Sequence, residues 1–339
     1  MTRTKLEILV TIPEKSNIFD TFFGKEQKCR LEKAGNVRWN TGSENYTEQQ
    51  LAAQLEGIDI CITGWGSPVF TPAVLEQAES LKLIAHDAGT IRPMVTNEVF
   101  ARGIRVTSGN EIFARSVAEG VMAYLLAALR RIPWYCDQII EGNWPGLEGT
   151  RGLLDRTVGL IGYGTIAGYL ADMLKAFGCK VMVNSTHTPD RVLREKGLIR
   201  ATEEEIFSIC DVVSVHRSLT EKTYHSIGRK QLELMKDGAI FVNTSRGAVV
   251  KESELEEVLR YKNISAILDV YETEPLPMQS GLRTLDNVFL MPHTAGPTED
   301  RRRYVTDYLL EDVERFLRGE KMAGEVDGNR AKSMTTVLS

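Results

Sequence analysis

Short runs of consecutive apolar residues alternate with helix-like segments along the whole chain. Most of these runs are rich in Val and Ile, which is typical of strands buried on both faces of a parallel sheet. A regular alternation of such strands with helices predicts an open, doubly wound α/β fold. We expect strands at residues 6–12, 58–63, 81–86, 104–107, 158–161, 180–184, 212–216, 239–243, 266–270 and 288–291.

Residues that typically begin or end helices separate these runs. Thr71 followed by Pro72 is typical of an N-cap with proline in the first helical turn. Thr202 with Glu205 three residues later is a capping box, and Gly178 is placed to end a helix. Residues 115–129 predict a long apolar helix, and residues 298–317 a charged one.

The order of these elements predicts two α/β units. A second strand–helix series begins at Thr157, after a break at Asn143-Trp144-Pro145-Gly146. The sequence does not show which unit the charged helix at 298–317 packs against. The tail from Asp327 onward is polar, and we expect it to be frayed.

Composition and charge narrow the class of protein. The chain has 339 residues, of which 42% are hydrophobic and 26% charged, as in soluble globular proteins of about two domains. Its formal net charge of −5 disfavours binding to nucleic acid or to an anionic membrane. The apolar run at 121–129 is far shorter than the roughly 20 residues of a membrane span. The five cysteines lack the spacing of a zinc site or a disulfide framework, so we expect no metal, reduced thiols and a cytoplasmic location.

The most specific local motif follows the strand at 158–161, where the chain reads Gly162-x-Gly164-x-x-Ala167. In dinucleotide-binding folds the first glycine makes a tight turn, the second lets the pyrophosphate approach, and the third small residue packs the helix on the strand. The N–H groups of Thr165 and Ile166, at the start of the helix, would bind the phosphates. A purely structural turn is the alternative.

The next strand bears on the choice of cofactor. NAD-binding folds usually carry an acidic residue about 20 positions after the glycine turn, which binds the ribose hydroxyl groups. Here the strand at 180–184 is followed by Ser185, Thr186 and His187, and no acid appears before Asp190. A carboxylate would repel a 2′-phosphate, so its absence favours NADP over NAD. The alternative is that these polar residues form only a solvated loop.

Three candidate catalytic residues follow later strands. Arg246 lies in Asn243–Gly247, Glu274 in the segment 268–275, and His293 in the segment 290–294. Taken singly, they could be a surface ion pair, a solvated acid and a structural histidine. Because parallel strands end at one edge of a sheet, we expect a cation, a carboxylate and an imidazole beside the dinucleotide turn. Such a set is suited to hydride transfer involving a 2-oxo acid.

With these motifs in place, the sequence resembles the D-isomer-specific 2-hydroxyacid dehydrogenases. The matching segments are 158–167, 243–249, 266–275 and 292–294, in the order of the family, with 116–119 matching its interdomain helix. The resemblance implies a Rossmann-type dinucleotide domain at 111–297. It also implies a flavodoxin-like substrate domain at 1–110, completed by 298–339, with a cleft that closes over substrate. A homodimer through the region 115–129 is implied as well.

The resemblance also implies a role for each catalytic residue. Arg246 would hold the substrate carboxylate and the C2 oxygen through its planar fork of donors. His293 would be the general acid in reduction and the base in oxidation, because imidazole titrates near neutrality. Glu274 would bond the second ring nitrogen and favour the protonated imidazole.

Further binding residues are implied by the same resemblance. Asp269 would bind the nicotinamide carboxamide, and Thr244 and Ser245 would line the nicotinamide side of the pocket. A second contact to the substrate carboxylate would come from the backbone N–H groups of a loop in the N-terminal domain, formed by Ala88, Gly89 and Thr90.

Two departures from the family pattern leave the substrate open. Members commonly carry Asp or Asn shortly after the glycine of the substrate loop, whereas this chain reads Gly89-Thr90-Ile91-Arg92-Pro93. Arg92 could add a second cation for an acidic or phosphorylated substrate or simply face solvent. The family loop His-x-Pro-Leu-Thr is here His216-Arg217-Ser218-Leu219-Thr220, so His216 and Arg217 are candidate contacts to the cofactor. Glyoxylate, hydroxypyruvate, phosphoglycerate-type and larger 2-oxo acids all remain possible. The alternative to an enzyme is a dinucleotide-sensing corepressor or scaffold on the same fold.

Overall fold

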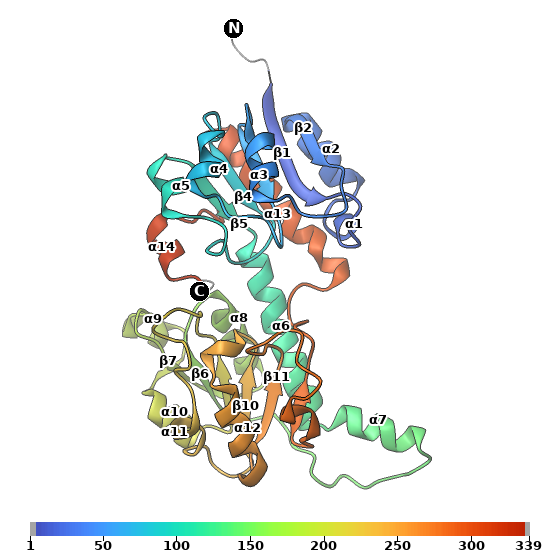
Figure 1. Ribbon diagram of the computed structural model, residues 1–339. Coiled ribbons are helices and arrows are strands. Elements are labelled where there is room, and N and C mark those ends of the chain that lie inside the picture. The colour runs from blue at the N-terminus through green and yellow to red at the C-terminus, as the bar shows by residue number, and fades with distance from the viewer. Residues whose placement is uncertain (1–4, 336–339) are drawn as a thin grey trace. The chain divides into compact units, whose positions relative to one another are not determined.

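The computed structural model describes residues 5–335, and these fold into two compact units (Figure 1). Unit 1 contains the residues up to Phe113 together with those from Pro297 onward, and unit 2 contains Ala114–Gly296. Each unit is built around one parallel sheet. The predicted fold class, two doubly wound α/β domains, is therefore confirmed.

The sheet of unit 1 has the strand order β2-β1-β3-β4-β5, and neighbouring strands are parallel. This is the order of a flavodoxin-like sheet, in which the winding reverses between β1 and β3. Its strands are β1 (Leu6–Pro13), β2 (Gly35–Asn40), β3 (Ile60–Thr63), β4 (Leu83–His86) and β5 (Arg105–Ser108).

Apolar side chains alternate between the two faces of this sheet, as successive strand residues must. Leu9 and Ile84 belong to one buried cluster, and Ile8 and Leu83 belong to the other. Helices cover both clusters, and the strands are therefore buried on both faces of the sheet. The helices of this unit are α1 (Phe19–Phe22), α2 (Lys25–Ala34), α3 (Glu48–Leu55), α4 (Pro72–Glu76), α5 (Asn97–Ala101), α13 (Arg302–Leu317) and α14 (Gly328–Lys332).

The charged C-terminal helix packs within unit 1, against α1 and α2. Two buried acids fix α13 or its immediate continuation to the sheet. Asp87 accepts a hydrogen bond of 2.7 Å from Thr306 Oγ1, and Asp312 accepts one of 2.6 Å from Thr107 Oγ1. The backbone N–H groups of Ala323 and Gly324 also donate to Asp312, at 2.6 and 2.7 Å. Residues distant in sequence thus complete the N-terminal unit.

The expectation of a frayed tail is wrong for the described part of it, which reaches residue 335. Asp327 caps α14 by accepting from Arg330 N at 2.8 Å, and Ala331 is buried. Just before the helix, Val326 N donates to Val106 O at 2.9 Å, and Glu325 pairs with Thr107 in an antiparallel bridge. The tail is ordered because it pairs with the edge strand β5, which sequence periodicity cannot show. Residues 336–339 lie outside the described residues.

The sheet of unit 2 has the strand order β12-β11-β10-β9-β6-β7-β8, again parallel throughout. Counted within the unit, this is the Rossmann order 3-2-1-4-5-6 with one further strand. The strands are β6 (Thr157–Ile161), β7 (Lys180–Asn184), β8 (Ile199–Arg200), β9 (Val212–Val215), β10 (Ile240–Asn243), β11 (Ser265–Leu268) and β12 (Val288–Leu290). The helices are α6 (Asn110–Leu129), which starts within unit 1, α7 (Ile132–Ile140), α8 (Thr165–Ala176), α9 (Asp190–Glu195), α10 (Glu203–Ile209), α11 (Arg229–Leu232) and α12 (Glu252–Tyr261).

Within the described residues, α6 is the one helix long and apolar enough to cross a bilayer. Length and composition alone do not distinguish a span from a core helix. Ala118, Val121, Leu125 and Leu129 of α6 belong to a buried cluster with residues of the unit 2 sheet. This packing is that of a core helix.

Candidate functional site

The glycine turn lies where the sequence places it, between β6 and α8. Gly162 has φ +94°, and a Cβ there would lie 2.7 Å from the carbonyl oxygen of His216. Gly164 is the N-cap of α8, and a Cβ at this position would meet no heavy atom within 4 Å. Ala167 is fully buried. Gly162 is therefore required by the backbone, whereas Gly164 leaves open space at the start of a helix.

This space fits a dinucleotide pyrophosphate. The first N–H groups of α8, including those of Thr165 and Ile166, have no partner within their own helix, and the helix dipole favours an anion at this end. At the carboxyl end of β10, the buried hydroxyl of Thr244 has no hydrogen-bond partner among the described residues. A buried hydroxyl without a partner is costly, so a ligand atom at this edge would satisfy it.

A cation that sequence reasoning missed contacts the loop after β7. Arg200 of β8 donates to the carbonyl oxygens of Ser185 and Thr188 and forms an ion pair with Asp190. The acid nearest to this loop in sequence is thereby paired with a guanidinium. Thr186 and His187 are exposed. No local sequence pattern could have found Arg200, because β8 is a two-residue exposed strand that forms by pairing with β7.

His216 and Arg217 have partners inside the protein. Arg217 Nη2 lies 2.5 Å from Glu203 Oε2 and 3.4 Å from Asn184 Oδ1. Burial lowers the pKa of His216 to about 4, so its ring is neutral at pH 7, and its Nε2 lies 2.9 Å from Ser214 Oγ. Neither residue offers an unpaired positive charge to a cofactor phosphate. Their predicted contact with the cofactor stays a prediction.

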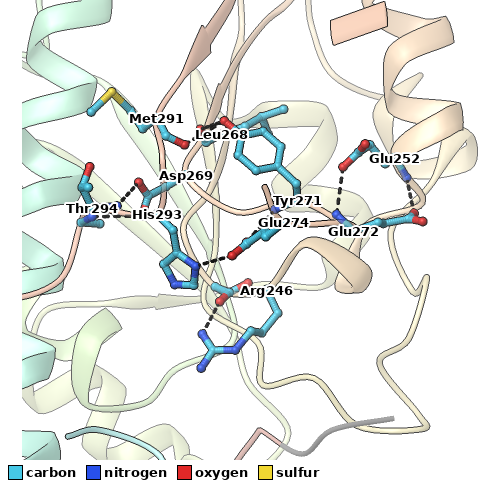
Figure 2. A network of polar contacts seen from close by, with 12 residues as sticks. Arg246, Glu252, Leu268, Asp269, Tyr271, Glu272, Glu274, Met291, His293 and Thr294 are labelled. Atoms are coloured by element: carbon cyan, nitrogen blue, oxygen red, sulfur yellow. Dashed lines mark hydrogen bonds and ion pairs between the residues drawn. The ribbon is translucent and has the colours of Figure 1, made fainter. Parts of the chain in front are cut away.

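His293 and Glu274 form a close pair. His293 Nδ1 lies 2.7 Å from Glu274 Oε2, while Glu274 Oε1 accepts from Tyr271 N at 3.1 Å (Figure 2). His293 follows β12 with φ +57°, a conformation that is uncommon outside glycine. The carboxylate fixes one ring nitrogen, and Nε2 remains available for a proton transfer. The histidine side chain is 49% exposed.

Arg246 belongs to the same group of side chains (Figure 2). Burial is the largest influence on its guanidinium and lowers its pKa, while the charge of Glu274 raises it. Its Nη1 donates to the carbonyl oxygen of its neighbour Ser245 at 2.6 Å, and it forms no ion pair with any described residue. The three predicted catalytic residues thus gather at one edge of the sheet, beyond the carboxyl ends of β10, β11 and β12.

Asp269 supports the histidine segment. Its side chain is buried, and its oxygens accept from Thr294 N at 2.8 Å and Ala295 N at 3.0 Å. The hydroxyl of Tyr124 on α6 lies 3.4 Å from Asp269 Oδ1 and 3.0 Å from Thr294 Oγ1. Burial, the largest influence, raises the pKa of Asp269. Asp269 therefore holds the backbone next to His293, a role that sequence reasoning missed, and its contact with nicotinamide stays a prediction.

The predicted substrate loop belongs to unit 1, where it follows β4. Ala88 is buried, and Thr90 Oγ1 donates to the carbonyl oxygen of Thr335 at 3.3 Å. Gly89 lies beside Asn110 and Phe113, at 3.6 and 3.8 Å from an added Cβ. Arg92 has no polar partner among the described residues. The role of this loop in binding a carboxylate stays a prediction, and so does that of Arg92.

Among residues 5–335, no group of His, Cys, Asp or Glu side chains is arranged to hold a metal ion. The polar residues at the site are a guanidinium, carboxylates, hydroxyls and one imidazole. This set suits proton transfer and anion binding.

Comparisons with known proteins agree with these motifs. Residues 122–295 match the model of the NAD-binding domain of D-isomer specific 2-hydroxyacid dehydrogenases. The chain is 34% identical over 297 residues to the D-3-phosphoglycerate dehydrogenase of Methanocaldococcus jannaschii, which covers 86% of this chain but only 55% of that protein. It is 34% identical over 253 residues to the glyoxylate reductase of Korarchaeum cryptofilum, with 73% of this chain and 76% of that protein covered.

Further relatives match over most of their length. The hydroxypyruvate reductase of Thermotoga maritima is 33% identical over 276 residues, which covers 80% of this chain and 89% of that protein. The crystal structure of a protein from Thermus thermophilus superposes with a TM-score of 0.78 and 29% identity, over 95% of this chain and 100% of that one. The resemblance predicted from the motifs is confirmed: this chain belongs to the D-isomer specific 2-hydroxyacid dehydrogenase family.

Proposed function

We propose that this protein is an NAD(P)-dependent oxidoreductase that interconverts a 2-oxo acid and the corresponding D-2-hydroxy acid. The observation that supports it most strongly is the 2.7 Å His293–Glu274 pair with Arg246 in the same group of side chains. The glycine turn between β6 and α8 lies in the same unit and leaves space for a dinucleotide.

Arg246 is suited to bind the substrate carboxylate. A partly buried guanidinium favours a counter-ion, and no described residue supplies one by an ion pair. Its planar fork can hold a carboxylate through two parallel hydrogen bonds and also reach the C2 oxygen. Arg246 would thereby orient the carbon that reacts.

His293 is suited to move the proton. When bound, the nicotinamide supplies the hydride that reduces C2 of the oxo acid. His293 donates a proton from Nε2 to the C2 oxygen in reduction and removes it in oxidation. Glu274 accepts from Nδ1, which sets the ring orientation and stabilises the imidazolium. Asp269 fixes the backbone of Thr294 and Ala295 and thereby holds the histidine in place.

We propose NADP rather than NAD as the preferred cofactor. The N–H groups of Thr165 and Ile166 would hold the pyrophosphate, and Ser185, Thr186 and His187 would lie beside the adenosine ribose. Two observations support this preference: no acid follows β7 directly, and Asp190 is paired with Arg200. A 2′-phosphate would therefore meet no unpaired carboxylate in this loop.

The test is a substrate panel. Glyoxylate, hydroxypyruvate, 3-phosphohydroxypyruvate and 4-methyl-2-oxopentanoate are each reduced with NADPH and with NADH, and loss of absorbance of the reduced cofactor is followed. Turnover of at least one acid with a higher kcat/KM for NADPH is expected. Binding of both dinucleotides without turnover of any acid would favour the dinucleotide-sensing corepressor or scaffold instead.

We also propose that the protein is a homodimer, with the contact on α7 and the loop after it. None of the residues of α7 is buried, and the helix extends away from the unit 2 sheet (Figure 1). Ile140, Trp144 and Leu147 are 83%, 92% and 82% exposed. Exposed apolar side chains in one segment mark an interface, and a second copy of the chain would bury them symmetrically. The predicted interface at 115–129 instead gives much of its apolar surface to the core of unit 2.

Light scattering after size exclusion tests this assembly. Wild-type protein is expected to elute with the mass of two chains. Ile140→Glu is expected to give a monomer, while Ile199→Glu, on exposed β8, leaves the mass unchanged. A monomeric wild type, or a dimer that survives Ile140→Glu, would refute the α7 contact.

A further inference from the structure

A polar cluster next to the catalytic group takes no part in the chemistry described above. It consists of His225, Glu252 and Glu272, which come from three separate segments of unit 2. Glu272 lies two residues before Glu274, and Figure 2 shows Glu252 and Glu272 bonded to each other beside Tyr271 and Glu274. The cluster therefore includes one residue of the loop that carries Glu274, the partner of the catalytic histidine.

The loops that carry Arg246 and Glu274 are in direct backbone contact. Gly247 follows Arg246, and a Cβ at this position would overlap the carbonyl group of Tyr271. No side chain larger than that of glycine fits between the two loops. Any shift of the backbone at 271–272 is therefore transmitted to the turn that carries Arg246.

Glu252 and Glu272 join α12 to the Glu274 loop through a reciprocal pair of hydrogen bonds. Glu252 N donates to Glu272 Oε1 at 2.7 Å, and Glu272 N donates to Glu252 Oε2 at 3.0 Å. The two carboxylates carry like charges and repel each other. Burial first, and the charge of Glu272 among the further causes, raises the pKa of Glu252. The two backbone N–H groups offset part of this repulsion, because each donates to the other residue's carboxylate.

His225 contacts this pair and the Arg246 turn. Its Nε2 lies 2.9 Å from the same Oε1 atom of Glu272, at ion-pair distance but without the geometry of a hydrogen bond, and its backbone N donates to the carbonyl oxygen of Ala248 at 2.8 Å, in the Arg246 turn. His225 has φ +47°, which costs conformational energy in a residue other than glycine. Such backbone strain persists only where the surrounding contacts fix it. One residue thus contacts both catalytic loops.

We propose that His225, Glu252 and Glu272 form a clamp that holds Arg246 and Glu274 at their working separation, with His225 and Glu272 as positioning residues for the proposed reaction. The inference rests on the proposed function, because it concerns the geometry of that site. His225 acts through the two loops and touches neither substrate nor cofactor. Misplacement of a catalytic group by about 1 Å can cost on the order of 100-fold in rate.

The clamp is tested by the steady-state kinetics of three variants, which are His225→Ala, Glu272→Ala and His225→Gln. Both alanine variants are expected to lower kcat by about 10- to 100-fold, with the NADPH dissociation constant within about twofold of wild type. His225→Gln is expected to restore most of kcat, because its amide N–H can reach Glu272 Oε1. Glu233→Gln is the matched control, because Glu233 also accepts a hydrogen bond in unit 2, from Tyr261, outside the cluster.

Hydrogen–deuterium exchange supplies a readout that does not depend on turnover. Amides at 244–250 and 269–275 are expected to exchange faster in His225→Ala and Glu272→Ala than in wild type, His225→Gln or Glu233→Gln. If His225→Ala fails to fold, the partly exposed Glu272 side chain still permits the test through Glu272→Ala. If the wild type reduces no 2-oxo acid, the proposed function has failed, and the exchange data alone decide on the clamp.

Three results would overturn the clamp. The first is wild-type kcat and wild-type exchange in both alanine variants. The second is a loss of kcat in His225→Ala that His225→Gln does not restore. The third is a loss of similar size in the Glu233→Gln control.

Discussion

The acid that precedes the predicted substrate loop gives a prediction about stability. Asp87 is 1% exposed, its Oδ2 accepts from Thr306 Oγ1 at 2.7 Å, and its Oδ1 has no hydrogen-bond partner among the described residues. Burial, together with the charge of Asp307, raises the pKa of Asp87 from its ordinary 3.8 to about 7, against the opposing effect of the Thr306 hydrogen bond. The folded protein therefore holds a proton that the unfolded chain releases.

The sign of the pH dependence follows from this difference. The carboxyl group is protonated in both states well below pH 3.8, so it then leaves the free energy of unfolding unchanged. As the pH rises toward 7, only the unfolded chain ionises, and stability falls. Above about pH 7 both states are ionised and the full penalty applies. The difference between the two pKa values corresponds to at most about 4 kcal/mol.

Asp87→Asn removes this penalty. The amide oxygen can still accept from Thr306, and no charge is buried. The variant is expected to match wild type near pH 4 and to exceed it by up to about 4 kcal/mol at pH 8. Urea unfolding of both proteins from pH 4 to pH 9 measures the difference.

Asp312→Asn is the matched control, because Asp312 is also buried in unit 1 but accepts from Thr107, Ala323 N and Gly324 N. This variant is expected to lose stability, because an amide cannot accept all of these hydrogen bonds. An unchanged difference between Asp87→Asn and wild type across the whole pH range would refute the argument about Asp87.

Two further predictions concern the site. His293→Ala is expected to lower kcat by about 10²- to 10⁴-fold while dinucleotide binding is kept; unchanged turnover would remove His293 from the mechanism. Ser185→Asp places a carboxylate directly after β7 and is expected to shift the kcat/KM ratio from NADPH toward NADH; equal or better use of NADPH would contradict the cofactor proposal.

The central strands of both sheets were predictable because their signal is local. Each is a run of apolar residues buried on both faces, and the observed bounds differ from the expected ones by no more than two residues. The edge strands β2 and β8 were missed. β2 mixes buried and exposed positions, and both residues of β8 are exposed. Their strand conformation comes from pairing with β1 and β7, which lies outside any local pattern.

The candidate site likewise has features that the sequence predicts and features that depend on the folded structure. The sequence by itself determined which residues stand at the carboxyl ends of β10, β11 and β12, because parallel strands bring those ends to one edge. Only the tertiary structure decided which partner each charged or polar side chain at the site has. Arg217 is paired with Glu203, Arg200 with Asp190, and Asp269 with the backbone beside His293. The protonation state of a charged group and its capacity to bind a ligand depend on its burial and on the partner within a few ångströms. Folding brings that partner from a distant part of the chain.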